Sequence, residues 1–175
     1  IPTSQLAGRI VEEGASVPVV GSGVHLINVE PEAPRVRVYT ETDHSGQFNM
    51  TGLQSGELLL SVYKPGYEMV RERVTYGTPI SGMTIRLRPN PGVGISVIDA
   101  ETGRGIREVF LSETIGDTDG IGLWVRLDEN GAGSLPSALA GSTLRVAAGR
   151  GYTPVVIQEW NAQPLELRLK KRGND

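Results

Sequence analysis

Short apolar runs with a period near two dominate the chain. Val36-Arg37-Val38-Tyr39 and Leu58-Leu59-Leu60-Ser61-Val62 alternate between two faces, as half-buried strands do. Segments rich in Asp, Ser and Gly separate the runs at intervals of about 8–12 residues, as turns require. The only helix-like stretch, Ser137–Leu139, is too short to change this all-β pattern. We therefore predict seven short strands in each half: Leu6–Glu12, Val24–Val29, Val36–Glu41, Gln47–Met50, Leu58–Tyr63, Glu68–Val74 and Met83–Arg88, then Gly94–Asp99, Glu108–Glu113, Leu123–Leu127, Gly133–Leu135, Leu144–Ala148, Val155–Gln158 and Leu165–Lys170.

The second half of the chain repeats the first at a constant spacing. The aligned pairs are Val24-His25-Leu26 with Val109-Phe110-Leu111, Asp43-His44-Ser45-Gly46 with Asp128-Glu129-Asn130-Gly131, and Gly66-Tyr67 with Gly151-Tyr152. Between the copies, Pro89-Asn90-Pro91-Gly92 forms a short, stiff joint. We predict two tandem domains, residues 1–89 and 90–175, each a seven-stranded Greek-key β-sandwich with almost no helix.

One detail of the repeat does not align. Leu58, Leu60 and Val62 follow Gly56 at even spacings, whereas Leu144, Val146 and Ala148 follow Gly141 at odd spacings. A slip of one residue would turn the core face of the strand outward. We expect a bulge or a different turn after Gly141 to absorb the slip.

Composition and charge narrow the function classes. The chain has 23 Gly and 11 Pro, which disfavours long helices. Its 17 Lys and Arg against 20 Asp and Glu give a net charge of -3, which argues against a nucleic-acid partner. No apolar run approaches the roughly 20 residues of a transmembrane segment. The absence of Cys excludes disulfides, thiolate zinc sites and cysteine nucleophiles.

Motifs of the first copy occur in a familiar order: Leu6-Ala7-Gly8-Arg9-Ile10-Val11, Thr42-Asp43-His44-Ser45-Gly46-Gln47-Phe48 and Gly66-Tyr67. This order resembles the carboxypeptidase regulatory-like domain, a transthyretin-like (prealbumin-like) β-sandwich. The second copy resembles a diverged member, because Gly133 stands where the first copy has Phe48. In physical terms the Asp caps a tight hairpin, the Gly supplies a positive φ and the aromatic residue begins the next inward strand. The motifs are therefore scaffold motifs.

The resemblance implies a non-catalytic structural or interaction module of a larger secreted, periplasmic or cell-surface protein, with a bacterial source. Its expected partners are other domains of that protein or a separate protein. Ile1-Pro2-Thr3-Ser4 lacks the basic and apolar regions of a signal peptide, so the printed chain is expected to be cytosolic or a mature or trimmed fragment. The related starch-binding-like sandwich gives the alternative, a carbohydrate-binding pair with a glycan partner. Repeats of Gram-positive adhesins share these motifs but depend on a Lys–Asn bond, and Arg9 stands where the first-strand Lys would be.

Residues of catalytic type do not form a recognisable active site in the sequence. Asp43, His44 and Ser45 have the residue types of a triad, but consecutive side chains diverge and a triad needs them to converge from separate elements. His25 and His44 are the only histidines, too few for a zinc site without nearby carboxylates. No nucleophile elbow and no phosphate-binding loop occurs. We expect no enzyme activity, no catalytic residue and no cofactor.

Two features of the second copy are candidates for ligand binding. Asp117-Thr118-Asp119-Gly120 places two carboxylates in a sharp loop, as calcium requires, although an ordinary polar hairpin explains it better. Trp124 and Trp160 are large aromatic residues, and an exposed ring can stack on a sugar. Trp124 lies between Leu123 and Val125, so we assign it to the core. Trp160 is the predicted exposed ring and the candidate ligand-binding residue.

Overall fold

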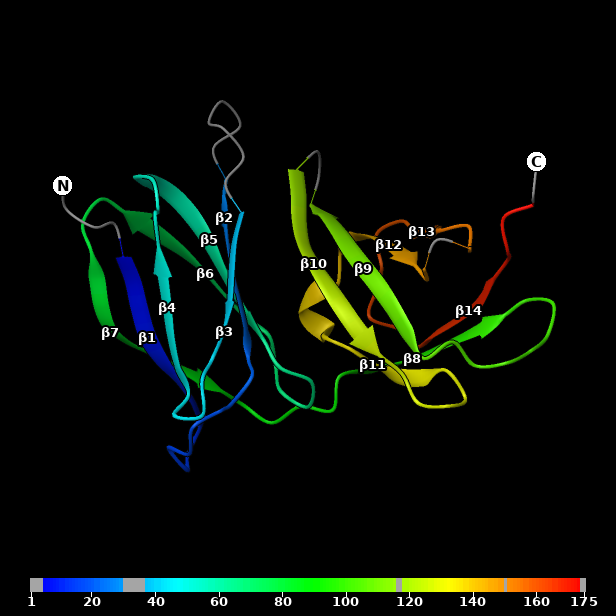
Figure 1. Ribbon diagram of the computed structural model, residues 1–175, viewed down its shortest axis with the longest axis horizontal. Coiled ribbons are helices and arrows are strands. Elements are labelled where there is room, and N and C mark those ends of the chain that lie inside the picture. Colours follow the sequence, from blue (N-terminus) through cyan, green and yellow to red (C-terminus); the bar gives the residue numbers. More distant parts are fainter. Residues whose placement is uncertain (1–4, 30–36, 116–117, 150, 174–175) are drawn as a thin grey trace. The chain divides into compact units, whose positions relative to one another are not determined.

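The computed structural model describes residues 5–29, 37–115, 118–149 and 151–173. The side chains of residues 115, 118 and 119 are also outside the description. The chain divides into two compact units, Ile1–Pro91 and Gly92–Asp175, and the described residues of each form seven strands (Figure 1).

Unit 1 is a sandwich of a three-stranded and a four-stranded sheet. The first sheet has the order β4-β1-β7, from β1 (Gln5–Glu12), β4 (Gln47–Thr51) and β7 (Ile80–Leu87). The second has the order β3-β2-β5-β6, from β2 (Gly23–Asn28), β3 (Arg37–Glu41), β5 (Gly56–Tyr63) and β6 (Val70–Tyr76). Only β1 and β7 pair in parallel among these described strands. The apolar positions of both sheets face each other and form one buried cluster, which includes Leu6, Ile10, Leu26, Phe48 and Leu60.

Unit 2 has the same strand order and the same strand directions. One sheet has the order β11-β8-β14, from β8 (Val93–Asp99), β11 (Ala132–Leu135) and β14 (Leu165–Leu169). The other has the order β10-β9-β12-β13, from β9 (Glu108–Ile115), β10 (Thr118–Arg126), β12 (Thr143–Ala147) and β13 (Val155–Ile157). The pair β8–β14 is again parallel. A 3-10 turn, η1 (Ser137–Leu139), occupies the helix-like stretch.

The predicted all-β class with almost no helix is confirmed, and each predicted strand overlaps an observed one. The largest difference is at β10, which begins at Thr118 instead of Leu123. Its register shifts between Asp119 and Gly122, so a bulge interrupts the alternation that the prediction relied on.

The misaligned strand is explained by a different turn. Gly56 is the first residue of β5, whereas Gly141 lies outside β12, in the turn that follows η1. The Gly141 N–H donates to the carbonyl of Trp160, and the Ser142 N–H donates to the carbonyl of Leu139. This turn adds the extra residue, so Leu144 and Val146 still face the core and are fully buried.

The two cores are filled differently next to the hairpin. In unit 1 the ring of Phe48 is 4% exposed and lies in the core. In unit 2 a Cβ placed on Gly133 would lie 2.5 Å from Cδ2 of Leu127, so Leu127 occupies the space above the glycine. Thr42 stands at the aligned position of unit 1, where it is buried and donates to the carbonyl of Val19. The larger side chain at Leu127 therefore compensates for the smaller one at Gly133.

Candidate functional site

The residues Asp43, His44 and Ser45 form a hairpin turn. Oδ1 of Asp43 accepts hydrogen bonds from the backbone N–H groups of Ser45 and Gln47, at 2.8 and 2.9 Å. These bonds hold the pKa of Asp43 below its usual value. Gly46 has φ 73°, as the scaffold interpretation requires. The carboxylate is thus engaged in capping the turn, and the turn interpretation is confirmed.

The aligned turn of unit 2 is built in the same way. Oδ1 of Asp128 accepts from the N–H groups of Asn130 and Ala132, at 2.9 and 2.8 Å. Gly131 has φ 79°, and a Cβ there would overlap the carbonyl oxygen of Val97. Both the backbone conformation and the close approach therefore require glycine at this position.

Each Gly-Tyr motif contacts the end of the first strand of its unit through its hydroxyl and the segment after the last strand through its backbone, at Pro89 in unit 1 and at Lys171 in unit 2. The hydroxyl of Tyr67 donates to Oε2 of Glu12 at 2.7 Å, and the hydroxyl of Tyr152 donates to Oδ2 of Asp99 at 2.8 Å. Glu12 pairs with the last residue of β7, and Asp99 pairs with the last residue of β14. We call each tyrosine–carboxylate pair the tyrosine latch of its unit.

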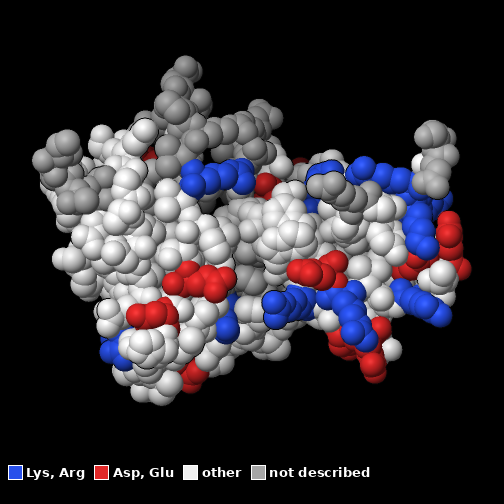
Figure 2. Space-filling view, in the orientation of Figure 1, with Lys and Arg blue, Asp and Glu red and all other residues white. Residues whose placement is uncertain are grey.

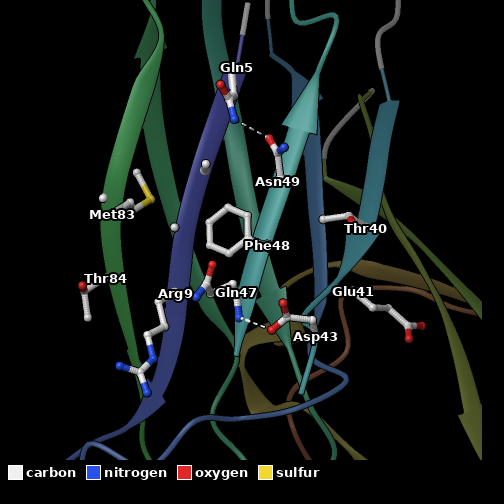
Figure 3. A pocket seen from close by; sticks show the side chains of 13 residues that line it. Gln5, Arg9, Thr40, Glu41, Asp43, Gln47, Phe48, Asn49, Met83 and Thr84 are labelled. Carbon is white, nitrogen blue, oxygen red and sulfur yellow. Dashed lines mark hydrogen bonds between the residues drawn. The ribbon is translucent and has the colours of Figure 1, made fainter. Parts of the chain in front are cut away.

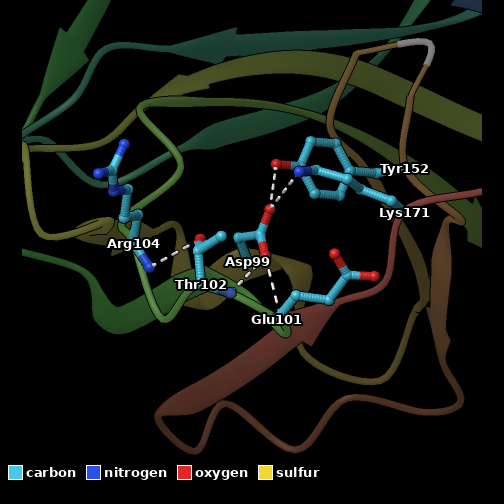
Figure 4. Close-up of polar contacts among 6 residues, drawn as sticks. All are labelled: Asp99, Glu101, Thr102, Arg104, Tyr152 and Lys171. Carbon is cyan, nitrogen blue, oxygen red and sulfur yellow. Dashed lines mark hydrogen bonds and ion pairs between the residues drawn. The ribbon is translucent and has the colours of Figure 1, made fainter.

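The latch of unit 2 is the more elaborate of the two (Figure 4). Oδ1 of Asp99 also accepts from the N–H groups of Glu101 and Thr102, each at 2.9 Å. Nζ of Lys171 lies 3.5 Å from Oδ2. The hydrogen bond from Thr102 and that from Tyr152 hold the pKa of Asp99 far below its usual value. Asp99 is therefore a charged structural anchor at neutral pH.

A second buried carboxylate lies inside unit 2. Glu113 on β9 is 2% exposed. Its Oε1 accepts from Oγ of Ser142 at 2.6 Å, and its Oε2 accepts from the N–H of Ile121 at 3.4 Å. Sequence reasoning missed this residue, because it stands in an ordinary strand pattern and belongs to no motif. Its contacts connect β9 with β10 and with the turn before β12.

The two tryptophans are placed opposite to the prediction. Trp160 is 2% exposed, and its Nε1 donates to the carbonyl of Gln163 at 2.9 Å. Trp124 is 64% exposed on the outer face of β10. The assignments of Trp160 to the surface and of Trp124 to the core are therefore wrong. Because a buried ring cannot stack on a sugar, Trp160 is a core residue and not the ligand-binding residue that was expected.

One cross-strand aromatic pair lies in each unit, and in each pair an exposed ring, Trp124 or Tyr39, lies against a half-buried one. Phe110 on β9 is opposite Trp124, with ring centroids 5.1 Å apart. His25 on β2 is opposite Tyr39, with centroids 4.7 Å apart. The repeat aligns the two pairs with each other, and this alignment was the signal that could have revealed them. Burial and then the nearby Arg37 charge lower the pKa of His25 to about 4, so its ring is uncharged at neutral pH.

The predicted calcium loop lies only partly within the described residues. Asp117 is outside them, and so is the side chain of Asp119. Within the part of the chain that the structure describes, no three His, Cys, Asp or Glu side chains gather as a metal site would require. Oδ1 of Asp128, in the next hairpin along the chain, caps its own turn.

A shallow groove of about 640 Å³ crosses the outer side of β1 and β4 in unit 1 (Figure 3). Its polar side chains bind one another, as Nε2 of Gln5 does with Oδ1 of Asn49 at 3.0 Å. Its charged groups are also engaged: Arg9 donates to the carbonyl of Ser45, Glu41 accepts from the hydroxyl of Tyr39, and Asp43 caps its turn. The groove is thus a surface of scaffold contacts.

On the face shown in Figure 2, basic and acidic side chains lie close to one another over both units. None of the three lysines lies in a core: Nζ of Lys64 donates to the carbonyl of Gly21, Lys170 is exposed and Lys171 approaches Asp99. In the described residues, no helix has the length and apolarity needed to cross a membrane.

Comparisons with known proteins give only distant similarity. No family model matches the sequence, and no curated protein matches it. Among solved structures, a streptococcal ancillary pilin has a TM-score of 0.37 and 16% identity over 98% of this chain, which spans 63% of that pilin. The shaft pilin SpaA of Lactobacillus rhamnosus GG has a TM-score of 0.39 and 11% identity over 98% of each chain. A DUF3823 family protein of Bacteroides uniformis has a TM-score of 0.39 and 12% identity over 90% of this chain and 99% of its own. Similarity at this level assigns neither a family nor a function to the chain.

Proposed function

We propose that this chain is a non-catalytic structural module, a tandem pair of β-sandwiches within a larger secreted or cell-envelope protein. In this role its partners are the neighbouring domains of that protein or a separate protein that docks on it. Within the proposal, both units are of the carboxypeptidase regulatory-like type, a prealbumin-like sandwich, and the domain boundary falls at residues 89 and 90.

The observation that carries the proposal is the use made of the polar motifs. Asp43 and Asp128 cap equivalent hairpins, and Tyr67 and Tyr152 form equivalent latches. A catalytic carboxylate must be able to change its proton or its partner during a reaction. These carboxylates instead hold backbone N–H groups and hydroxyls that fix strand ends, and the same arrangement occurs in both units.

The distribution of charge also supports a structural role. Asp99 has a pKa far below its usual value, and its four donors keep it bound to its own unit. A general acid or base would need a pKa near the working pH. The most strongly perturbed carboxyl group of the described residues therefore serves rigidity.

The test is the native size and location of the polypeptide that contains this segment. An antibody raised against the segment is applied to fractionated source cells and to the culture medium. We expect a band far above the 18.8 kDa of this chain, in the envelope or the medium. A band of about this mass in the cytosol would contradict the proposal.

A further inference from the structure

The edges of the sheets show how this molecule avoids unwanted strand pairing. An exposed edge is a template for another strand, and proteins protect it by shortness, charge or a bulge. Strands β4, β11 and β13 are short, with 5, 4 and 3 residues. The other edges have charges: Arg37 and Glu41 on β3, Arg71, Glu72 and Arg73 on β6, Arg86 on β7, and Glu166 and Arg168 on β14. Strand β7 also has a register shift, with Gly82 at φ 77°.

Strand β10 is the longest of the described edge strands and has the most exposed aromatic side chain. It is 9 residues long and lies at the end of its sheet. From Gly120 to Val125 it contains no charged residue. Its inward side chains Ile121, Leu123 and Val125 are 2–4% exposed, whereas Trp124 is 64% exposed. The strand has a bulge between Asp119 and Gly122 and a charged residue near each end, Asp119 and Arg126. Between them it combines an uncharged stretch with a large apolar ring on its outer face.

The free backbone groups of β10 can be assigned from its register. The N–H of Leu127 donates to the carbonyl of Arg107 next to β9, at 2.7 Å. Because antiparallel pairs alternate between bonded and non-bonded residues, Val125 and Leu123 also direct their backbone groups toward β9. Gly122, Trp124 and Arg126 therefore direct theirs away from the sheet. The edge offers a row of donors and acceptors to a further strand.

We propose that β10 pairs antiparallel with β10 of a second copy of this chain, with Trp124 of one copy opposite Gly122 of the other. Both residues direct their backbone groups outward, so this register makes bonded pairs on each side of Leu123. Gly122 has no side chain of its own on the outer face, and the ring of Phe110 lies over it, so the indole ring of the other copy packs against Phe110. The register is self-complementary, as a two-fold interface requires.

The side chains around this register fit the pairing. A Cβ on Gly122 would lie 2.6 Å from Cζ of Phe110, so Phe110 already lies over that glycine. The incoming Trp124 meets Phe110 of the other copy as well as Phe110 of its own, and four aromatic rings form a continuous cluster. Arg126 is opposite Gly120, so the pairing places no like charges opposite each other.

The aligned strand of unit 1 is a natural control. Tyr39 on β3 stands at the position that matches Trp124 and is 54% exposed. Arg37, which matches Gly122, places a charged side chain where the pairing of β10 has none. An equivalent pairing of β3 is therefore disfavoured, although the aromatic residue is present.

The first test is sedimentation velocity of the full chain over a concentration series. The expected species at high concentration has twice the 18.8 kDa of one chain. Trp124→Lys is expected to weaken the dimer by about 30-fold or more, the loss typical of a central aromatic residue in an interface. Tyr39→Lys is expected to leave the dimer unchanged. A wild-type chain that stays monomeric at all concentrations overturns the proposal, and so does a dimer that Trp124→Lys does not weaken.

The second test measures the register. The chain has no cysteine, so Arg126→Cys provides a single site for a spin label. In the proposed register the two labelled positions are six residues apart along the strands, which gives a backbone separation of about 20 Å. Glu41→Cys, the matched position in unit 1, is expected to show no defined distance at this separation. The register is refuted if the Glu41→Cys labels show the separation of about 20 Å, or if the Arg126→Cys labels do not show it. An unchanged circular dichroism spectrum verifies that each labelled variant is folded.

Discussion

The opposite environments of the two tryptophans predict very different costs of truncation. A Trp side chain buries up to about 250 Å², worth about 6 kcal/mol at about 25 cal/mol per Å². Residual burial in the unfolded chain reduces this to about 4–5 kcal/mol. Trp160 is 2% exposed and its Nε1 donates to Gln163, so Trp160→Ala is expected to lower the free energy of unfolding of unit 2 by about 4 kcal/mol. Trp124 is 64% exposed and buries about a third as much, so Trp124→Ala is expected to cost about 1 kcal/mol.

Urea denaturation followed by far-ultraviolet circular dichroism measures these costs, because the substitutions themselves change the fluorescence. The measurements are made at low concentration, so that association of β10 does not contribute. Trp160→Phe, which retains an aromatic ring, is expected to cost about 1–3 kcal/mol and keeps the comparison possible if Trp160→Ala does not fold. Equal costs at the two positions, or a larger cost at Trp124, would refute the assignment of Trp160 to the core.

Four single-residue substitutions test other parts of the structure, one of them as a control. Gly131→Ala is expected to disrupt unit 2, because the added Cβ would overlap the carbonyl oxygen of Val97. Gly103→Ala is the control: Gly103 has φ 68° but open space around it. This control substitution is expected to lower the free energy of unfolding in urea by only about 1 kcal/mol. Asp99→Asn is expected to lower the melting temperature near pH 7. The difference in melting temperature from wild type is expected to narrow as the pH falls below about 3.8. The reason is that a carboxyl group with a lowered pKa in the folded state stabilises the fold only while it is ionised. A difference in melting temperature between Asp99→Asn and wild type that stays constant in acid would contradict the stabilising role of the Asp99 charge. The pKa of His25 is about 4 in the folded chain, against 6.5 for a free histidine side chain. Between these two pH values the unfolded chain binds a proton that the folded chain does not, so stability falls as the pH falls. His25→Phe is expected to remove this pH dependence of the melting temperature in a series of melting curves.

The parts of the fold that depend on neighbouring residues could be predicted from the sequence. The caps at Asp43 and Asp128 bind N–H groups two and four residues ahead, so the local motif contains the whole interaction. The strands followed from alternation and turn residues for the same reason. Trp124 could also have been placed correctly, because Leu123 and Val125 face inward and the residue between them must face outward.

Other features depend on contacts that the sequence does not reveal. Trp160 follows β13 in a turn where Glu159 has φ 44°, so alternation gives no information about its direction. The tyrosine latches join residues 55 and 53 positions apart. The repeat aligns Glu12 with Val97 and so misses Asp99, the carboxylate that takes its place. Long-range pairing of this kind appears only when the strands are assembled.

The parallel pairing of the first and last strands determines how each unit responds to tension. Because β1 and β7 run in the same direction, the beginning of β1 and the end of β7 lie at opposite ends of the sheet (Figure 1). A pull on the two ends of unit 1 acts along the strands, so the hydrogen bonds between them are sheared together instead of opening one after another. The pair β8–β14 gives unit 2 the same geometry. Each sandwich is thus arranged to resist stretching, and the tyrosine latch at the end of each parallel pair adds a further contact that must break before the strands can slide.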